Sequence, residues 1–360
     1  MSVPFVEVPL SRVVSLQRGH DLTWQQRRPG KVPVVGSAGP NGFHDRAIVP
    51  GPGVVLGRSG ASFGRAHYVN EDFWPHNTAL FATDFHGNDP RFVYYLLDSI
   101  DFENYNSGGA QQSLNRNFIA SIPVRMPHYD EQRRMAGALD DADALVVALR
   151  QTVTKKEAIK QGMMQQLLTG RTRVPGFSKP WQNRALGDIA TIRTGSRNNQ
   201  DKISGGRFPF FVRSEKVERI NSYSHDCEAI LIPGEGGIGS IFHYIDGKFE
   251  VHQRVYKISE FSLEANGKFL FHYMRHFFGA HARENSVKAT VDSLRLPTFK
   301  NFGVGLPEMV EQKAIVAALD DAQSELDSLQ NRIGKARSVK TGMMQELLDG
   351  RTRLSEEVGA

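Results

Sequence analysis

Two polar segments of the sequence gather side chains that can form paired hydrogen bonds with planar ligands. They are residues 107–118, "SGGAQQSLNRNF", and 284–295, "ENSVKATVDSLR". Gln and Asn can bond to adenine through two atoms, and Arg can do the same with guanine. The candidates for base contact are Gln111, Gln112, Asn115 and Arg116 in the first segment, and Lys288, Asp292 and Arg295 in the second. The competing interpretation of both segments is an ordinary solvated loop.

A second group of arginines is suited to binding phosphate. The Gly-rich stretch 57–64, "GRSGASFG", contains Arg58 and is followed by Arg65. Glycine permits a tight hairpin turn and a close approach of the backbone to a ligand. We therefore expect a hairpin here, with both arginines available to nucleic acid. Further candidates of the same kind are Arg197, Arg213 and Arg254.

The sequence lacks a complete catalytic motif. The second Gly-rich stretch, 234–240, has the glycines of a phosphate-binding loop but not its Lys, and a strand is expected where a helix should follow. An amino-methyltransferase needs an Asn/Asp-Pro-Pro-aromatic loop, whereas residues 89–92 read Asp-Pro-Arg-Phe. His76 and His252 occupy equivalent places, for which a shared structural hydrogen bond is favoured over a paired site. The sequence thus predicts no catalytic residue, no metal site and no cofactor held by this chain.

Composition limits the class of protein. The chain has 360 residues, 40% apolar and 23% charged, with a net charge of +5 and a pI of about 9.2. A basic chain without an Arg-rich tail would bind nucleic acid through folded surfaces. No apolar run approaches the about 18 residues of a membrane span, and one cysteine, Cys227, cannot form an internal disulfide. We expect a cytoplasmic protein that binds no membrane.

The most distinctive feature of the chain is an internal repeat. Residues 127–173 align with 307–353 without a gap, at an offset of 180 residues, and about twenty of the 47 positions are identical. The shared text includes "ALDDA", "GMMQ" and "GRTR". The segments that precede the two copies, 1–126 and 181–306, resemble each other only at scattered positions. This alternation of variable and shared segments indicates a duplicated plan.

Each shared segment is predicted to form one long helix. Apolar residues recur at spacings of four and three, the pattern of a coiled-coil seam. The seam is Met135, Leu139, Ala142, Val146, Leu149 and Val153 in the first copy, and Ile315, Leu319, Ala322, Leu326, Leu329 and Ile333 in the second. After a shift of phase it continues as Ile159, Met163, Leu167 and as Val339, Met343, Leu347, which leaves Lys155, Lys156 and Lys160 on a solvated face. Each helix should end at Gly170 or Gly350, since glycine suits the left-handed position after a helix.

The repeat predicts an α+β chain of four parts, which are 1–126, 127–180, 181–306 and 307–360. Strand–turn–strand units are expected at 54–69 and 229–245, and short helices at 89–100 and 267–278. Because the duplicated halves should pair, we expect two globular domains joined by two long antiparallel helices in an intramolecular, pseudo-twofold coiled coil. The alternative is a pair of parallel helices that dimerises with another chain.

The repeated motifs resemble those of a known family. The stretches "EQ…ALDDAD", "KKEAIKQGMMQQLLTGRTR", "EQKAIVAALDDAQ" and "KTGMMQELLDGRTR", together with "WQNRALGDIATIRTG" at 181–195, are similar to the specificity subunit of type I restriction–modification systems. The resemblance implies that 1–126 and 181–306 are target-recognition domains. Each would bind half of a bipartite, asymmetric site in double-stranded DNA, with the helices as a spacer, and the chain itself would catalyse no reaction.

The resemblance also implies protein partners. Two modification (methyltransferase) subunits, which use S-adenosylmethionine, are expected to dock on the helices, and restriction subunits that use ATP and Mg²⁺ are optional further partners. The residues expected to touch a partner are Gln165, Gln166, Gln345 and Glu346, whereas Met163, Met164, Met343 and Met344 should pack inside the helix pair. The competing functions are a stand-alone DNA methyltransferase or nuclease with an unrecognised active site, and a coiled-coil scaffold without a role at DNA.

Overall fold

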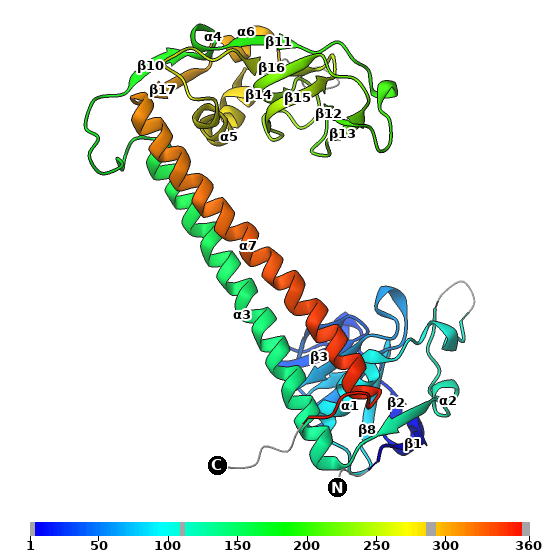
Figure 1. Cartoon of the computed structure of the whole chain (residues 1–360). Helices are drawn as coiled ribbons and strands as arrows, with labels where there is room; N and C mark the ends of the chain where they lie inside the picture. Colours follow the sequence, from blue (N-terminus) through cyan, green and yellow to red (C-terminus); the bar gives the residue numbers. More distant parts are fainter. Residues whose placement is uncertain (1–3, 109–111, 286–292, 355–360) are drawn as a thin grey trace. The chain divides into compact units, whose positions relative to one another are not determined.

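The structure, a computed structural model, describes residues 4–108, 112–285 and 293–354 and divides into two compact units (Figure 1). Unit 1 contains Met1–Arg150 and Asn331–Ala360, and unit 2 contains Gln151–Gln330. Each unit therefore combines one variable segment with part of each shared segment.

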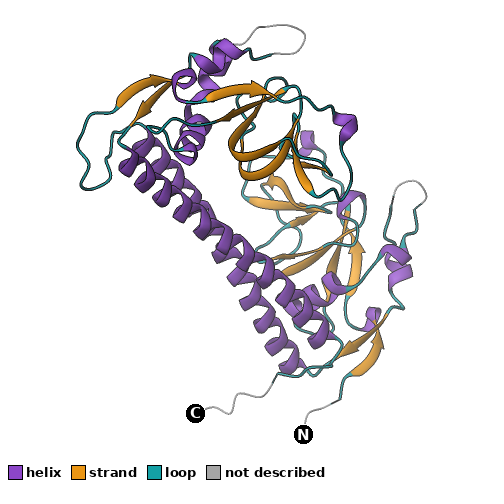
Figure 2. Cartoon of the chain, turned by 45° about the horizontal axis from the view of Figure 1, so that its top comes forward, coloured by secondary structure: helices purple, strands orange, loops and turns teal. Residues whose placement is uncertain are grey.

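Unit 1 builds its variable segment from three small sheets and short helices (Figure 2). The elements are β1 (Val6–Pro9), η1 (Leu10–Arg12), β2 (Ser15–Arg18), η2 (Trp24–Gln26), β3 (Val32–Gly36), β4 (Gly39–His44), β5 (Gly53–Gly57), η3 (Gly60–Ser62), β6 (Ala66–Val69), β7 (Trp74–Pro75), β8 (Ala79–Asp84), α1 (Pro90–Ser99), η4 (Glu103–Tyr105), α2 (Arg116–Ile119) and β9 (Pro123–Met126). The strand orders are β1-β9, β2-β8-β5-β6 and β4-β3-β7. Only β3 and β7 pair in parallel among the described strands of this unit.

Unit 2 repeats this plan with one larger sheet. Its elements are β10 (Gln182–Ala185), α4 (Leu186–Ile189), β11 (Thr191–Thr194), η5 (Asn199–Asp201), β12 (Phe208–Phe211), β13 (Glu218–Ile220), β14 (His225–Pro233), β15 (His243–Val251), β16 (Val255–Ser259), α5 (Gly267–Glu284), α6 (Leu296–Lys300) and β17 (Gly303–Leu306). The strand orders are β10-β17 and β11-β16-β14-β15-β12-β13. The parallel pair β12 and β15 corresponds to β3 and β7 of unit 1, so the two variable segments share a topology despite their different sequences.

The expected strand–turn–strand units are confirmed. β5 pairs antiparallel with β6, and β14 pairs antiparallel with β15. The Gly-rich stretches connect these strands, and Gly60, Gly64 and Gly236 adopt φ angles of 78°, 74° and 70°. Glycine reaches these positive φ values without the steric cost that a Cβ atom would add. The Gly-rich stretches are therefore turns between strands.

The expected short helices are α1 and α5. Asp89 caps α1 by accepting a hydrogen bond of 2.8 Å from the N–H of Phe92, and Asn266 caps α5 in the same way at 3.0 Å. Side-chain caps of this type satisfy N–H groups that have no partner inside the helix. α5 continues to Glu284, beyond the predicted end at residue 278.

The long helices are α3 (Tyr129–Leu168) and α7 (Met309–Leu348). In unit 2, the Lys156 Nζ atom lies 2.7 Å from a carboxylate oxygen of Glu325, and Lys160 donates a hydrogen bond to Gln323. The partner number falls along α7 as the residue number rises along α3, so the two segments run antiparallel. In unit 1 the end of α7 packs with the beginning of α3 in one core cluster, which is the same direction. The predicted intramolecular antiparallel pairing is confirmed within each unit.

The first part of the predicted seam is buried or half-buried in both helices, but the predicted shift of phase is wrong. Ile159 is 46% exposed and Val339 is 65% exposed. The four–three spacing instead continues without a shift through Lys156 and Lys160 in α3 and through Lys340 in α7, all half-buried. Lysine can lay its apolar stem in such a seam while its ammonium group reaches a polar partner. Lys156 and Lys160 are therefore seam residues and do not belong to a solvated face.

A hydrophobic core attaches each variable segment to the long helices. In unit 1, α1 packs with the beginning of α3 and the end of α7 around Phe92, Leu97, Met135 and Leu347. In unit 2, α5 packs with the end of α3 and the beginning of α7 around Phe269, Phe278, Leu168 and Ile315. The shared helices thus complete both cores, which explains why they must recur in each half.

Polar contacts at equivalent positions fix the same junctions. Gln132, buried in the first turn of α3, accepts a hydrogen bond of 2.9 Å from the N–H of the residue that caps α1 and donates one of 3.1 Å to the Pro127 carbonyl. Gln312, its counterpart in α7, makes the corresponding bonds of 2.8 Å each to the cap residue of α5 and to Pro307. The "EQ" of each repeat therefore joins a long helix to a short one.

The "GRTR" motif follows each long helix and contacts the first turn of the other one. Its glycine has φ of 67° in one copy and 66° in the other, the left-handed conformation expected after a helix. Arg173 then donates two hydrogen bonds of 2.6 Å to Glu311, which is buried in the first turn of α7. Its counterpart Arg353 lies 3.8 Å from Glu131 in the first turn of α3. The motif therefore holds the end of each long helix against the beginning of the other, and we call this arginine–glutamate contact the clasp.

Candidate nucleic-acid interface

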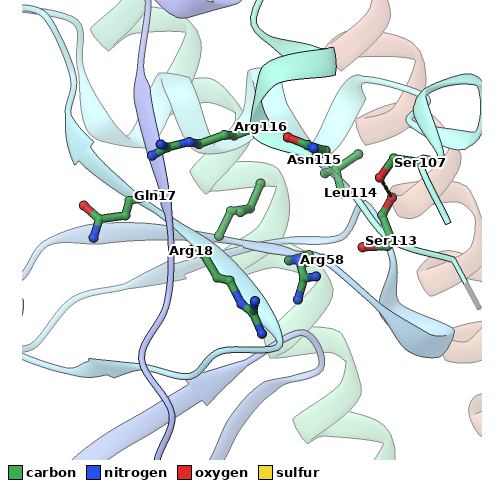
Figure 3. A pocket seen from close by; sticks show the side chains of 9 residues that line it. Gln17, Arg18, Arg58, Ser107, Ser113, Leu114, Asn115 and Arg116 are labelled. Carbon is green, nitrogen blue, oxygen red and sulfur yellow. Dashed lines mark hydrogen bonds between the residues drawn. The ribbon is translucent and has the colours of Figure 1, made fainter.

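A polar cleft with a volume of about 630 Å³ lies on unit 1 (Figure 3). This arginine cleft is lined by Gln17, Arg18, Arg58, Leu80, Ser107, Ser113, Leu114, Asn115 and Arg116. Most of these side chains are polar or cationic, and they come from distant parts of the sequence. The cleft is therefore a product of the fold and cannot be read from one local motif.

Three segments meet in the arginine cleft. The end of β2 supplies Arg18, the connection after β5 supplies Arg58, and the start of α2 supplies Asn115 and Arg116. The N–H of Leu114 donates a hydrogen bond of 2.8 Å to the carbonyl of Arg58, which holds the last two segments side by side. Asn115 caps α2 by accepting a hydrogen bond of 3.0 Å from a backbone N–H of its first turn.

The arginine cleft carries uncompensated positive charge. Arg18 and Arg58 each donate to the backbone carbonyl of Asn77 at 3.3 Å, and Arg116 donates to a carbonyl of β2 at 3.5 Å. Within the described part of the chain, these three guanidinium groups have no carboxylate partner at ion-pair distance. Burial and the neighbouring charge of Arg18 lower the pKa of Arg58. Such a surface attracts phosphate, because among the described residues no acidic side chain lines the cleft.

The structure gathers some of the predicted residues of unit 1 and leaves others apart. Arg58, Asn115 and Arg116 meet in the arginine cleft. Gln112 and Arg65 are exposed but do not line it. Gln111 lies outside the described residues.

Two residues of the arginine cleft, Gln17 and Arg18, were missed by the sequence interpretation. They end a short strand with no distinctive local pattern. The available signal was Gly19, which has a counterpart in Gly195 of unit 2. A Cβ atom at Gly19 would lie 2.2 Å from the His76 carbonyl, and one at Gly195 would lie 2.1 Å from the Val251 carbonyl. The close approach at Gly19 brings the end of β2 beside the Asn77 carbonyl.

Unit 2 has a matching backbone arrangement with different side chains. The N–H of Leu294 donates to the carbonyl of Gly234 at 2.8 Å, as Leu114 does to Arg58 in unit 1. Glu235 follows Gly234 and pairs with both Arg213 and Arg254, lying 3.3 Å from the former. The arginines of this surface therefore share a carboxylate, whereas those of the arginine cleft do not.

The remaining predicted residues of unit 2 are dispersed. Arg197 pairs with the buried carboxylate of Glu250 at 3.4 Å. Arg295 is exposed and precedes α6. Lys288 and Asp292 lie outside the described residues.

His76 and His252 have corresponding structural contacts. The backbone N–H of His76 donates to the Val35 carbonyl at 2.8 Å, and the backbone N–H of His252 donates to the Phe211 carbonyl at 3.0 Å. Burial lowers the pKa of both imidazoles, which favours their neutral forms. The backbone bonds join the same two parallel strands in each unit. The Nδ1 atom of each ring also contacts the residue two positions further on, Thr78 Oγ1 at 3.1 Å and the backbone nitrogen of Arg254 at 3.0 Å, as expected of a shared structural hydrogen bond.

The residues predicted to touch a partner lie at the ends of the long helices. Gln165, Gln166 and Gln345 are exposed, and Glu346 accepts a hydrogen bond of 3.1 Å from Thr352. The paired methionines of both "GMMQ" motifs are partly buried and pack against the cores that join the long helices to the variable segments, namely Met163, Met164, Met343 and Met344. No contact in the structure tests the predicted partner role of Gln165, Gln166, Gln345 and Glu346, which stays a prediction.

Among the residues that the structure describes, no group of three or more His, Cys, Asp or Glu side chains could hold a metal ion. In the same part of the chain, no helix has the length and apolar character needed to cross a membrane.

Comparison with known proteins gives consistent matches. A protein-family model described as "Type I restriction modification DNA specificity domain" matches residues 5–161 and 178–336. The chain is 29% identical over 168 residues to the type I restriction enzyme EcoDI specificity subunit of Escherichia coli, a match that covers 47% of this chain and 37% of that protein. The matched part thus spans less than half of that relative.

Two solved structures have a similar fold. The type I restriction–modification system S subunit from M. genitalium has a TM-score of 0.65 at 13% identity, covering 98% of this chain and 97% of that chain. A chain from a structure of "complex assembly and conformational transition of the type I R-M system" has a TM-score of 0.62 at 15% identity, covering 96% and 97%. Since the family model matches both halves and most of the sequence, the chain belongs to the family of the type I restriction–modification DNA specificity domain.

Proposed function

We propose that this chain recognises a bipartite DNA site for a type I restriction–modification complex and catalyses no reaction itself. The observation that carries the proposal is the arginine cleft of unit 1, where Arg18, Arg58 and Arg116 lack carboxylate partners among the described residues. Cationic side chains of this kind bind phosphate. The Asn115 amide beside them uses its oxygen to cap α2 and has an NH2 group that suits an acceptor on a base edge.

The two units would read different half-sites. Their surfaces share a backbone hydrogen bond but present Arg58 in one unit and Gly234 with Glu235 in the other. A carboxylate can accept a hydrogen bond from cytosine and repels phosphate, so the two surfaces favour different DNA contacts. The DNA site would therefore be asymmetric, unlike the palindrome that a symmetric homodimer reads.

The long helices would set the distance between the half-sites. α3 and α7 each contain 40 residues, which corresponds to about 60 Å of α-helix. Adding about four residues, roughly one helical turn, to each helix should lengthen the unread gap and leave the half-site sequences unchanged. A change in the half-site sequences would contradict this division of roles.

The outer faces of the helices would dock two modification subunits, which bring S-adenosylmethionine, and restriction subunits with ATP and Mg²⁺ could join them. Ile159 and Val339 are exposed apolar residues at equivalent positions of the repeat. Gln166 and Glu346 follow each of them by seven residues and thus lie on the same helical face. Equivalent surfaces in the two units suit two copies of one partner, and Gln165 and Gln345 extend them.

The proposal is tested by methylation with the assembled complex. The chain is purified alone and with the modification subunit of its own system, and each sample is incubated with DNA and labelled S-adenosylmethionine. We expect methyl transfer only with the modification subunit, and the methylated adenines should define two unlike half-sites. Methyl transfer by the chain alone would support the stand-alone enzyme instead, and an assembled complex without sequence preference would support a scaffold.

A further inference from the structure

Unit 1 exposes a tryptophan in an unusual setting. Trp24, the first residue of η2, is 68% exposed. The guanidinium carbon of Arg27 lies 4.0 Å from the centre of its ring, so a cation covers one face of the indole. We call the stacked pair of Trp24 and Arg27 the aromatic platform.

The backbone under the aromatic platform is held firmly. Arg27 donates to the carbonyl of Asn41 in β4, and the next residue, Arg28, binds both carboxylate oxygens of Asp45 at 2.7 and 3.1 Å. At Gly42, where φ is 80°, an added Cβ atom would lie 2.8 Å from Arg27 and 3.4 Å from the Trp24 ring. A rigidly backed, exposed aromatic ring loses little conformational entropy when it meets a ligand.

A hydrogen bond links the segment that precedes the aromatic platform to a residue that holds the arginine cleft. Asn77, whose carbonyl accepts from Arg18 and Arg58, also donates to Asp21 at 2.9 Å, three residues before Trp24. The charge of Arg27 contributes, after burial, to the lowered pKa of His76, which precedes Asn77. Residues 17–46 contain five Lys or Arg residues against two aspartates. Charge complementarity therefore favours a polyanion as the occupant.

We propose that Trp24 stacks on the bases of the DNA bound by unit 1, acting as a wedge at a base step beside the half-site. Apolar side chains on basic surfaces insert between base pairs in this way, at the cost of local unstacking. Aromatic stacking tolerates every base, so the wedge would select for an easily unstacked step without reading its hydrogen-bond pattern. This inference rests on the proposed function.

The test uses the full chain and a duplex that carries the methylation-mapped site, with 2-aminopurine at successive positions of the half-site bound by unit 1 and of the base pairs that flank it. Fluorescence of 2-aminopurine rises where its neighbour unstacks. We expect a rise with the native chain, its loss with Trp24→Ala, and its retention with Trp24→Phe. Affinity should fall roughly 5- to 150-fold for Trp24→Ala, while the salt dependence of binding stays unchanged because no charge is removed.

Leu263→Ala, at a site 98% exposed in unit 2, is the matched control, and thermal unfolding checks each variant. Native fluorescence and affinity in Trp24→Ala would overturn the wedge and leave the proposed function intact. Loss of assembly with the modification subunit at unchanged DNA affinity would assign the platform to a protein contact and also overturn it. Failure of the native chain to prefer the mapped duplex would refute the proposed function itself.

Discussion

Replacing Arg18, Arg58 and Arg116 together with alanine should remove most of the phosphate binding of unit 1. Each of these guanidinium groups lines the arginine cleft without a carboxylate partner in the described chain, so each is available to neutralise one phosphate. Each neutralised phosphate contributes about 0.9 to the slope of log affinity against log salt concentration. The triple variant should therefore lower that slope by about 2.7.

That change is large enough to measure. With a slope difference of about 2.7, raising KCl from 50 to 200 mM should weaken DNA binding by the native chain roughly 40-fold more than binding by the triple variant. Fluorescence anisotropy of a labelled duplex, titrated with the full chain at several KCl concentrations, reports the slope directly. The expected curve of the variant is weaker at low salt and flatter throughout.

The control removes the same net charge elsewhere on unit 1. Arg133, Arg150 and Arg337 are exposed on the long helices, and their alanine triple should change the slope little, because distant exposed charges are screened. An unchanged slope in the cleft variant would refute the assignment of the cleft to phosphate. Equal slopes in the cleft and control variants would show that net charge, and not the cleft, determines binding.

Three further predictions concern the frame, its response to pH and its partners. Gln132→Leu and Gln312→Leu should each destabilise their own unit by about 2–4 kcal/mol, because each leaves a buried N–H and carbonyl unpaired. Hydrogen exchange of the α1 and α5 amides measures this loss. An effect in one unit alone would contradict the equivalence of the two junctions. Burial lowers the pKa of His272 in the folded chain below its ordinary value of 6.5. As pH falls below about 6.5, the unfolded chain therefore binds a proton at His272 that the folded chain does not, and the free energy of unfolding decreases. His272 contacts Asp320 at 3.2 Å, as Tyr95 of unit 1 contacts the equivalent Asp140 at 2.7 Å. His272→Tyr should therefore keep the contact and reduce the difference in urea unfolding between pH 8 and pH 5, and an unchanged difference would exclude His272 as its source. Ile159→Asp and Val339→Asp should block assembly with the modification subunit in size-exclusion chromatography, whereas Ile203→Asp, at an exposed apolar site of unit 2, should not; normal assembly of the first two would remove the helices from the docking surface.

The fold was predictable where local periodicity and duplication agree. The four–three spacing, the helix-ending glycines and the Gly-rich turns each depend on a few neighbouring residues, and each is confirmed. The error at Ile159 and Val339 has a clear cause. Apolar type was taken as the mark of the seam, but Lys160 and Lys340 occupy seam positions by using their aliphatic stems.

The site was predictable only in part, because it is assembled from distant segments. Arg58, Asn115 and Arg116 could be selected by residue type, but nothing local places Arg18 beside Arg58. That contact depends on β2 pairing with β8, 62 residues or more along the chain. The difference in charge between the units also depended on tertiary contacts, because Glu235 is unremarkable in sequence until Arg213 and Arg254 are seen to share it.

The two units show how DNA preference could change without disturbing the frame. The hydrogen bond that positions each binding segment uses a backbone carbonyl, from Arg58 in unit 1 and from Gly234 in unit 2, so the side chain at that position is free to vary. The clasp and the junctions use side chains, since Glu311 and Gln312 are buried and each makes several bonds through its own functional group. Substitution there leaves a buried polar group unpaired, whereas substitution at a binding position changes only what the solvent or DNA meets. This physical asymmetry accounts for a chain whose halves repeat in their helices and differ in the segments that we propose bind DNA.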